Sequence, residues 1–173
     1  HHSFWNFGDI KPGDWGTNVI SFHVDDNDAY LCLASFEEDG ESPHGENIAD
    51  YINVFSFIDE DGDGNFDPQK DTGLGTSTLG DGFLTSLDPE NEHHLSSTST
   101  EYITLAWCAG EIEVDDDTGD ISCDGSTVSD EAQGSSFGAE MVAYVEQVRN
   151  NLEFNCEDRL IEPTTNSTDS ADQ

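Results

Sequence analysis

The net charge of this chain constrains its folding more than any other feature of the sequence. Asp and Glu account for 39 of the 173 residues, Lys and Arg for only 4, and the formal net charge at pH 7 is -35. In dilute buffer a compact state at this charge density repels itself strongly, because little salt is present to screen the carboxylates from one another. We therefore expect the chain to fold in concentrated salt, with bound cations, or with both.

The same charge excludes two classes of partner. Nucleic acids and anionic membranes are bound through clusters of Lys and Arg, and the only such residues here are Lys11, Lys70, Arg149 and Arg159. The sequence also has no run approaching the roughly 20 apolar residues that a membrane helix needs. We expect neither nucleic-acid binding nor membrane insertion of the mature form.

The apolar residues predict one folded, all-β domain. Hydrophobic residues make up 34% of the chain, with 10 Phe, 3 Trp and 4 Tyr among them, which suffices for one modest core. Short segments rich in β-branched and aromatic residues, bounded by Gly, Asp, Asn or Pro, predict strands at 19–24, 30–36, 51–58, 102–108 and 141–148. Short helical turns are expected at 47–51 and 84–95. This pattern favours an antiparallel β-sandwich with long acidic loops.

Four cysteines predict two disulfides. They form no Cys-x-x-Cys pair, which argues against a zinc or thioredoxin-like site, and an even number in an acidic, Lys-poor chain is typical of proteins outside the cell. Cys108 and Cys123 flank an acidic stretch, 111–120, that is typical of an exposed hairpin, so a local bridge is the preferred pairing. Cys32 would then pair with Cys156. Four buried free thiols are the alternative.

The segment 59–71 predicts a calcium site. It reads Asp-Glu-Asp-Gly-Asp-Gly-Asn-Phe-Asp and then Pro-Gln-Lys-Asp, which matches the first nine positions of an EF-hand loop. Position twelve is Lys70 instead of a bidentate Glu. The candidate ligands are Asp59, Asp61, Asp63, Asn65, Asp67 and, in place of the missing Glu, Asp71. The alternative is an acidic turn in a generally acidic protein.

The metalloprotease signature is missing from the sequence. There is no His-Glu-x-x-His run, and carboxylate pairs are uninformative in so acidic a chain. We expect the protein not to be an enzyme, with a secreted hydrolase as the weakest of three hypotheses.

Three segments form a recognisable pattern in chain order. The first, 7–14, reads Phe-Gly-Asp-Ile-Lys-Pro-Gly-Asp and is followed by two predicted strands joined by an acidic turn. The second is the aromatic strand 102–107, and the third is 137–147, which ends on aromatic-x-Glu-Gln. Together they resemble the TasA/camelysin family of secreted proteins with SipW-type signal peptides, especially its members from salt-loving archaea.

This resemblance implies a jelly-roll-like sandwich exported to the cell surface and, as in several relatives, a subunit of extracellular fibres or biofilm matrix. In such fibres a terminal segment of one subunit completes the sheet of the next, which is donor-strand complementation. The expected partners are other copies of the chain, with covalent glycans as a further candidate. A monomeric calcium-dependent adhesion or carbohydrate-binding module is the alternative function, with Trp5, Trp15 or Trp107 as ligand platforms.

The sandwich domain is expected at 11–162, between two terminal segments. Residues 1–10 include Phe4, Trp5 and Phe7, and this arm is either the inter-subunit strand or the first strand of the domain itself. Residues 163–173 are mostly Ser, Thr, Asn and Asp with little to bury, which predicts a mobile tail. Within the tail, Asn166 begins an Asn-x-Thr acceptor pattern for N-glycosylation, provided that the protein is secreted by an archaeal or eukaryotic source.

Overall fold

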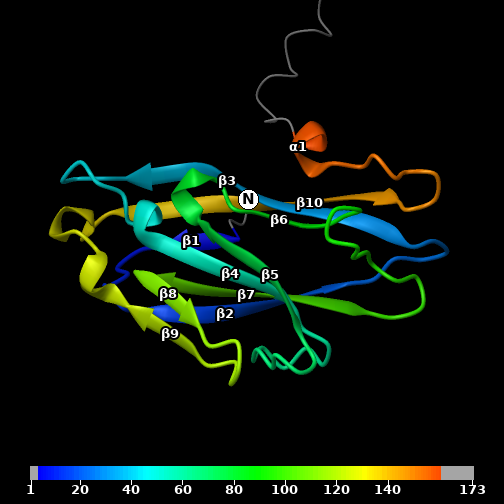
Figure 1. Cartoon of the computed structure of the whole chain (residues 1–173). Coiled ribbons are helices and arrows are strands. Elements are labelled where there is room, and N and C mark those ends of the chain that lie inside the picture. The colour runs from blue at the N-terminus through cyan, green and yellow to red at the C-terminus, as the bar shows by residue number, and fades with distance from the viewer. Residues whose placement is uncertain (1–3, 161–173) are drawn as a thin grey trace, which may run out of the picture.

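The protein is an antiparallel β-sandwich of two four-stranded sheets (Figure 1). The computed structural model describes residues 4–160, and the side chains of these except residues 37–39. Sheet I has the order β1-β10-β3-β6, with bounds Trp5–Phe7, Ser136–Gln147, Ala29–Glu41 and Leu84–Leu87. Sheet II has the order β2-β7-β4-β5, with bounds Trp15–Phe22, Glu101–Ala109, Ile52–Ile58 and Thr72–Thr78. The expected all-β class is confirmed.

A small hairpin and a few short helices complete the described fold. Strands β8 (Glu111–Val114) and β9 (Ile121–Asp124) form a separate two-stranded sheet, the hairpin expected between the two cysteines. Four 3-10 turns and one short helix lie in the connections: η1 (Ile48–Tyr51), η2 (Leu79–Asp81), η3 (Gly125–Thr127), η4 (Asp130–Ala132) and α1 (Cys156–Arg159). Within residues 4–160, no helix is long and apolar enough to cross a membrane.

All five predicted strands are present, and two further strands, β5 and β6, were not predicted from the sequence. The segment 84–95 was expected to be helical, yet Leu84–Leu87 is strand β6, with Thr85 opposite Leu33 and Leu87 opposite Leu31. The helical expectation was wrong because Asp88 caps a tight turn instead, accepting the N–H groups of Glu90 and Asn91. Strand β5, from the Ser/Thr-rich segment after the acidic loop, was also not expected.

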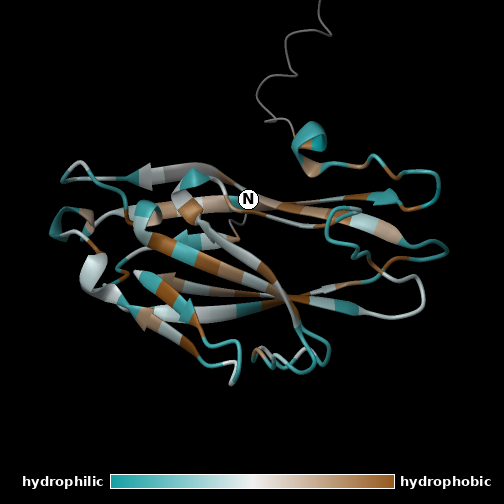
Figure 2. Cartoon of the chain, in the orientation of Figure 1, coloured by the Kyte–Doolittle hydropathy of each residue, from teal (hydrophilic) through white to brown (hydrophobic). Residues whose placement is uncertain are grey.

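The core lies between the two sheets and is built from alternate residues of their central strands. Leu31 and Leu33 of β3 face Ile103 and Leu105 of β7, and all four are at most 1% exposed. Figure 2 shows apolar residues concentrated along the strands and polar residues in the connections. The carboxylates therefore lie mainly in the loops, where water and salt reach them.

The N-terminal arm belongs to this core in the isolated chain. Strand β1 pairs antiparallel with β10, Trp5 opposite Ala139 and Phe7 opposite Phe137. Trp5 is 2% exposed and stacks against Phe7, whereas Phe4 is at the surface. Two alternatives were open for residues 1–10, an inter-subunit strand or the first strand of the domain. In the isolated chain Trp5–Phe7 is the first strand of sheet I, so the sandwich begins at β1 and not at residue 11.

Two disulfides attach peripheral segments to the outer faces of the sandwich, with the pairing expected from the sequence. Cys32 of β3 bonds to Cys156 at the start of α1, and Cys108 of β7 bonds to Cys123 of β9. The second bond holds the β8–β9 hairpin over sheet II, where a small second core surrounds Phe55 and Phe57.

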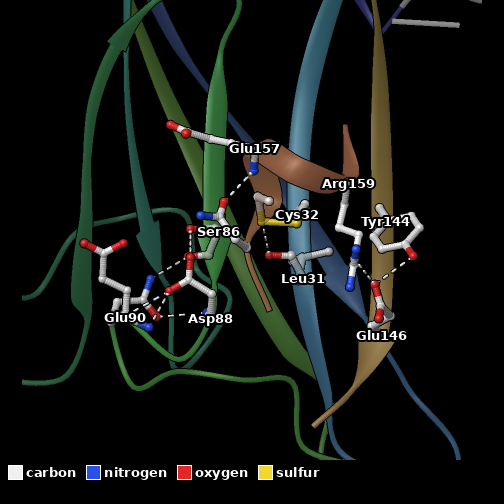
Figure 3. The surroundings of a disulfide bond; sticks show 12 residues. Leu31, Cys32, Ser86, Asp88, Glu90, Tyr144, Glu146, Glu157 and Arg159 are labelled. Atoms are coloured by element: carbon white, nitrogen blue, oxygen red, sulfur yellow. Dashed lines mark hydrogen bonds and ion pairs between the residues drawn. A yellow bond between two sulfur atoms is a disulfide. The ribbon is translucent and has the colours of Figure 1, made fainter. Parts of the chain in front are cut away.

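The Cys32–Cys156 bond holds the C-terminal segment on sheet I (Figure 3). Beside it, Tyr30 stacks on Phe154, and the Arg159 Nε donates to a Glu146 carboxylate oxygen at 2.7 Å. The Tyr144 hydroxyl donates to the same carboxylate at 2.8 Å. These hydrogen bonds, that of Tyr144 first, lower the pKa of Glu146 below its ordinary value. The segment before residue 160 is thus tied to β10 by charge and to β3 by the disulfide.

The two disulfides are expected to differ in their contribution to stability. They are separated by 124 and 15 residues of chain, and in the chain-entropy model a longer closed loop restricts the unfolded state more. Replacing Cys32 and Cys156 by Ala should lower the free energy of unfolding by about 5 kcal/mol, and replacing Cys108 and Cys123 by about 3 kcal/mol. Equilibrium urea unfolding in concentrated salt measures both. An equal or reversed order would contradict the expectation.

Candidate metal centre

The predicted calcium loop connects β4 to β5 and begins with a buried carboxylate. Asp59 follows directly after Ile58, the last residue of β4, and its side chain is fully buried. Its backbone N–H donates to the carbonyl oxygen of Tyr102 at 2.9 Å, which continues the strand pairing by one residue. The start of the loop is therefore held at a defined position against β7.

Asp59 folds the loop around itself. One carboxylate oxygen accepts the N–H of Gly62 at 2.8 Å, and the other accepts the N–H of Gly64 at 2.9 Å and the Thr104 hydroxyl at 2.7 Å. Both glycines have positive φ, +69 and +82, a backbone conformation that residues with a Cβ rarely adopt. Three donors compensate for removing this carboxylate from water.

Three carboxylates converge at the turn. One oxygen from each of Asp59, Asp61 and Asp63 lies within 4.8 Å of the others, and among the side chains that the structure describes no second group of three or more His, Cys, Asp or Glu gathers in this way. The backbone N–H of Asn65 donates to Asp63 at 2.7 Å and, as the largest influence, lowers the pKa of that carboxyl. A set of ionised carboxylate oxygens is the donor type that Ca²⁺ prefers.

The other predicted ligands have different positions. Asp71 accepts the N–H groups of Glu60 and Asp67, so its carboxylate closes the base of the loop. Asp67 is next to Lys70, whose Nζ lies 3.3 Å from Asp67 and 3.7 Å from Asp61. For Asn65, the described hydrogen bond uses the backbone. Of the six predicted ligands, three are thus brought together, and Asp67 joins them through a lysine.

Lys70 is the cation of this cluster in the structure. Hydrogen bonding to Asp67 and the charges of Asp67 and Asp61 raise its pKa. Its ammonium neutralises part of the charge that a divalent ion would neutralise, so the two would compete. Thr104 is a partner that sequence reasoning missed, because it comes from β7, 45 residues away from Asp59.

Two of the described histidines lie outside this cluster, each beside a single carboxylate. His23 pairs with Asp25 at 3.1 Å and His94 with Asp28 at 3.3 Å, in separate pairs. Asn166 and the predicted tail 163–173 lie outside the described residues.

The three tryptophans proposed as ligand platforms differ in exposure. Trp5 is buried, and Trp107 is half-buried against Phe7, with ring centroids 4.9 Å apart. Trp15, on β2, is 69% exposed. Only Trp15 among the three presents its indole ring to solvent.

Comparison of the chain with protein-family models, with curated proteins and with solved structures found no match.

Calcium is expected to stabilise the protein through the three converging carboxylates. A ligand present at 100 times its Kd adds about 2.7 kcal/mol, which for a chain of this size raises Tm by about 5–10 °C. The measurement is the Tm of chelator-treated protein with and without Ca²⁺ at constant ionic strength.

Two isosteric variants make this test specific to the loop. Asp61→Asn with Asp63→Asn keeps the oxygens that accept backbone N–H groups and removes two charges, so the calcium-dependent shift should disappear. Asp116→Asn with Asp117→Asn, both exposed in the β8–β9 turn, removes the same charge and should leave the shift intact. A wild-type Tm that does not respond to Ca²⁺ would exclude a structural calcium site here.

Proposed function

We propose that this protein is a secreted structural subunit of an extracellular filament, in which copies are joined by strand addition. The observation that supports this proposal best is an incomplete edge of sheet I. Strand β10 has 12 residues, but β1 pairs with only three of them, 137–139. On that side, residues 141–147 of β10 have no paired strand within the described chain.

Side chains that should be interior are exposed along this edge. Ala143 lies opposite Leu33 and Val145 opposite Leu31, and residues directly opposite in an antiparallel pair point to the same face. The two leucines are buried in the core, yet Ala143 is exposed and Val145 is 47% exposed. A sandwich with exposed interior positions beside an unpaired strand has room for one more strand.

The opposite wall of this opening is also apolar. Ile20 and Phe22 of β2 and Val24 after it are partly buried against the main core. A hollow of about 250 Å³ at the end of the edge is lined by Val24, by residues 25, 27 and 29, and by residues 145–147. An extended segment placed beside β10 would bury apolar side chains on both walls and satisfy main-chain groups of β10.

The N-terminal arm of a second copy is the proposed donor. In the isolated chain, Trp5 and Phe7 fill the start of this position, and in a filament the same segment of a neighbour would take it, as in a domain swap. Phe4, Trp5 and Phe7 would then be the inter-subunit contacts expected from the sequence. The donated arm would pair further along β10 than the chain's own arm does, beside residues 141–147, and would cover Ala143 and Val145.

The resemblance to the TasA/camelysin family agrees with other properties of the chain. The strands alternate between sheets in the orders 1-10-3-6 and 2-7-4-5, which supports the jelly-roll form of the sandwich. Two disulfides support an oxidising, extracellular location at the cell surface. In this proposal calcium stiffens the 59–71 loop and the role is non-catalytic.

A calcium-dependent adhesion or carbohydrate-binding module is the second candidate. The exposure of Trp15 favours it, because sugars stack on open aromatic faces, and β2 also contacts the acidic loop through Val19 beside Gly64. Such a module would remain monomeric, so electron microscopy and size-exclusion chromatography in concentrated salt separate the two candidates.

The filament proposal predicts the effect of a charge placed on the open edge. Val145→Lys puts an ammonium where the added strand would pack, and because Val145 is already 47% exposed, the folded monomer should keep its Tm within a few degrees. Filaments should be lost. Negative-stain microscopy and sedimentation measure the outcome.

The matched control is Leu152→Lys, which adds the same charge at a residue that is 82% exposed and outside both sheets. It should leave filaments unchanged. If Val145→Lys assembles as well as Leu152→Lys, the open edge of β10 is not the site of strand addition.

A further inference from the structure

The outer edge of β2 is a second place where strands of the chain remain unpaired. Among the described residues, strand β2 pairs with β7 alone and forms one border of sheet II. Its eight residues are Trp-Gly-Thr-Asn-Val-Ile-Ser-Phe, without a single charged side chain. In a chain where 39 of 173 residues are acidic, both border strands of sheet II, β2 and β5, are free of charge, and β2 is the longer of the two.

Edge strands of monomeric proteins are usually protected, and β2 lacks the usual protection. Short length, bulges, prolines and charged side chains are the common devices. Strands β1 and β6, at the borders of sheet I, have only three and four residues. Strand β5, at the other border of sheet II, faces a register irregularity at Ser56/Phe57 and contains Gly75 at φ +122. The β2–β7 register, in contrast, is continuous over all eight pairs.

The outward side chains of β2 are also suited to contact. Trp15 is 69% and Val19 43% exposed, and the exposed Thr17 and Ser21 alternate with them. The β8–β9 hairpin covers Phe55, Phe57 and Ala106 on the same face of sheet II. Gly64 of the acidic loop lies beside Val19 and Thr17, and the largest exposed apolar side chain of the row is that of Trp15. The strand therefore offers both free main-chain groups and uncovered apolar area.

We propose that β2 is a self-association surface, where the β2 strands of two copies pair antiparallel across a two-fold axis and join their two copies of sheet II. A basic partner would be drawn to the acidic loops, whereas β2 has no charge for it to recognise. For two copies that each have a net charge of -35, a charge-free strand is the place where close approach adds least repulsion. A two-fold contact uses the same patch twice, so no other partner surface is required.

The residues at the ends of β2 favour the antiparallel orientation. Asp14 precedes the strand, and His23, paired with Asp25 at 3.1 Å, follows it. Parallel pairing would place Asp14 beside Asp14 and Asp25 beside Asp25. Antiparallel pairing places each Asp14 at the end that includes the His23 imidazole. This pairing uses the main-chain groups at the border of sheet II and none of those of β10 in sheet I, so it does not depend on the filament proposal.

The test compares two pairs of added charges in full-length Val145→Lys protein, where strand addition at β10 should be blocked. Trp15→Glu with Ser21→Glu places carboxylates at both ends of β2, on side chains that are exposed. Thr76→Glu with Leu152→Glu adds the same charge at exposed positions on β5 and in the C-terminal segment. Tm reports folding for each variant, and sedimentation equilibrium in concentrated salt measures self-association.

We expect a monomer–dimer equilibrium that the β2 pair weakens at least about tenfold in Kd, which corresponds to about 1.4 kcal/mol, and that the control pair leaves unchanged. Amide exchange of β2 should slow as protein concentration rises, while that of β5 should not. A protein that is monomeric up to about 1 mM, or equal weakening by both pairs, would overturn the proposal. If Val145→Lys still forms filaments, the strand-addition proposal fails, and concentration-dependent exchange of β2 alone then decides this one.

Discussion

Repulsion between carboxylates is the constraint to which the rest of the structure is fitted. The strands of sheet II contain a single acidic residue, Glu101, and the described carboxylates lie mostly in connections. There many of them accept backbone N–H groups of the following residues, as Asp63, Asp115 and Asp124 do. These hydrogen bonds lower the pKa of each carboxyl, because a donor stabilises the ionised form. The acidic residues thus form the turns while the charge-free strands form the core.

This separation of acidic turns from charge-free strands explains how three carboxylates come together at the candidate metal centre. A buried carboxylate, Asp59, is tolerated because Gly62, Gly64 and Thr104 donate to it. Its burial holds the turn so that Asp61 and Asp63 approach one another despite their charges, and Lys70 offsets part of the repulsion. A divalent cation would offset more of it. The same reasoning applies to association between copies, which is least costly where charge is absent, as along β2.

Local patterns predicted much of this architecture because their physical causes are local. Segments rich in β-branched and aromatic residues identified the long strands, and the Asp-Gly repeat identified the loop in which three carboxylates converge. The acidic stretch between Cys108 and Cys123 was correctly interpreted as a hairpin. Local patterns failed at Leu84–Leu87, which lies in the segment expected to hold helical turns and is a strand because β3 is available to pair with it. They also missed β5, whose glycines and hydroxyls have little strand propensity of their own.

The sequence by itself determined the all-β class, the position of the acidic loop and the placement of charge outside the core, since these depend on side-chain type and spacing along a few residues. Only the tertiary structure decided that Trp5 and Phe7 pack in their own sandwich, that Thr104 reaches Asp59, and that Ala143 and Val145 remain uncovered. Each of these depends on which strands become neighbours, and that choice is made by packing two sheets together, not by any single segment of the chain.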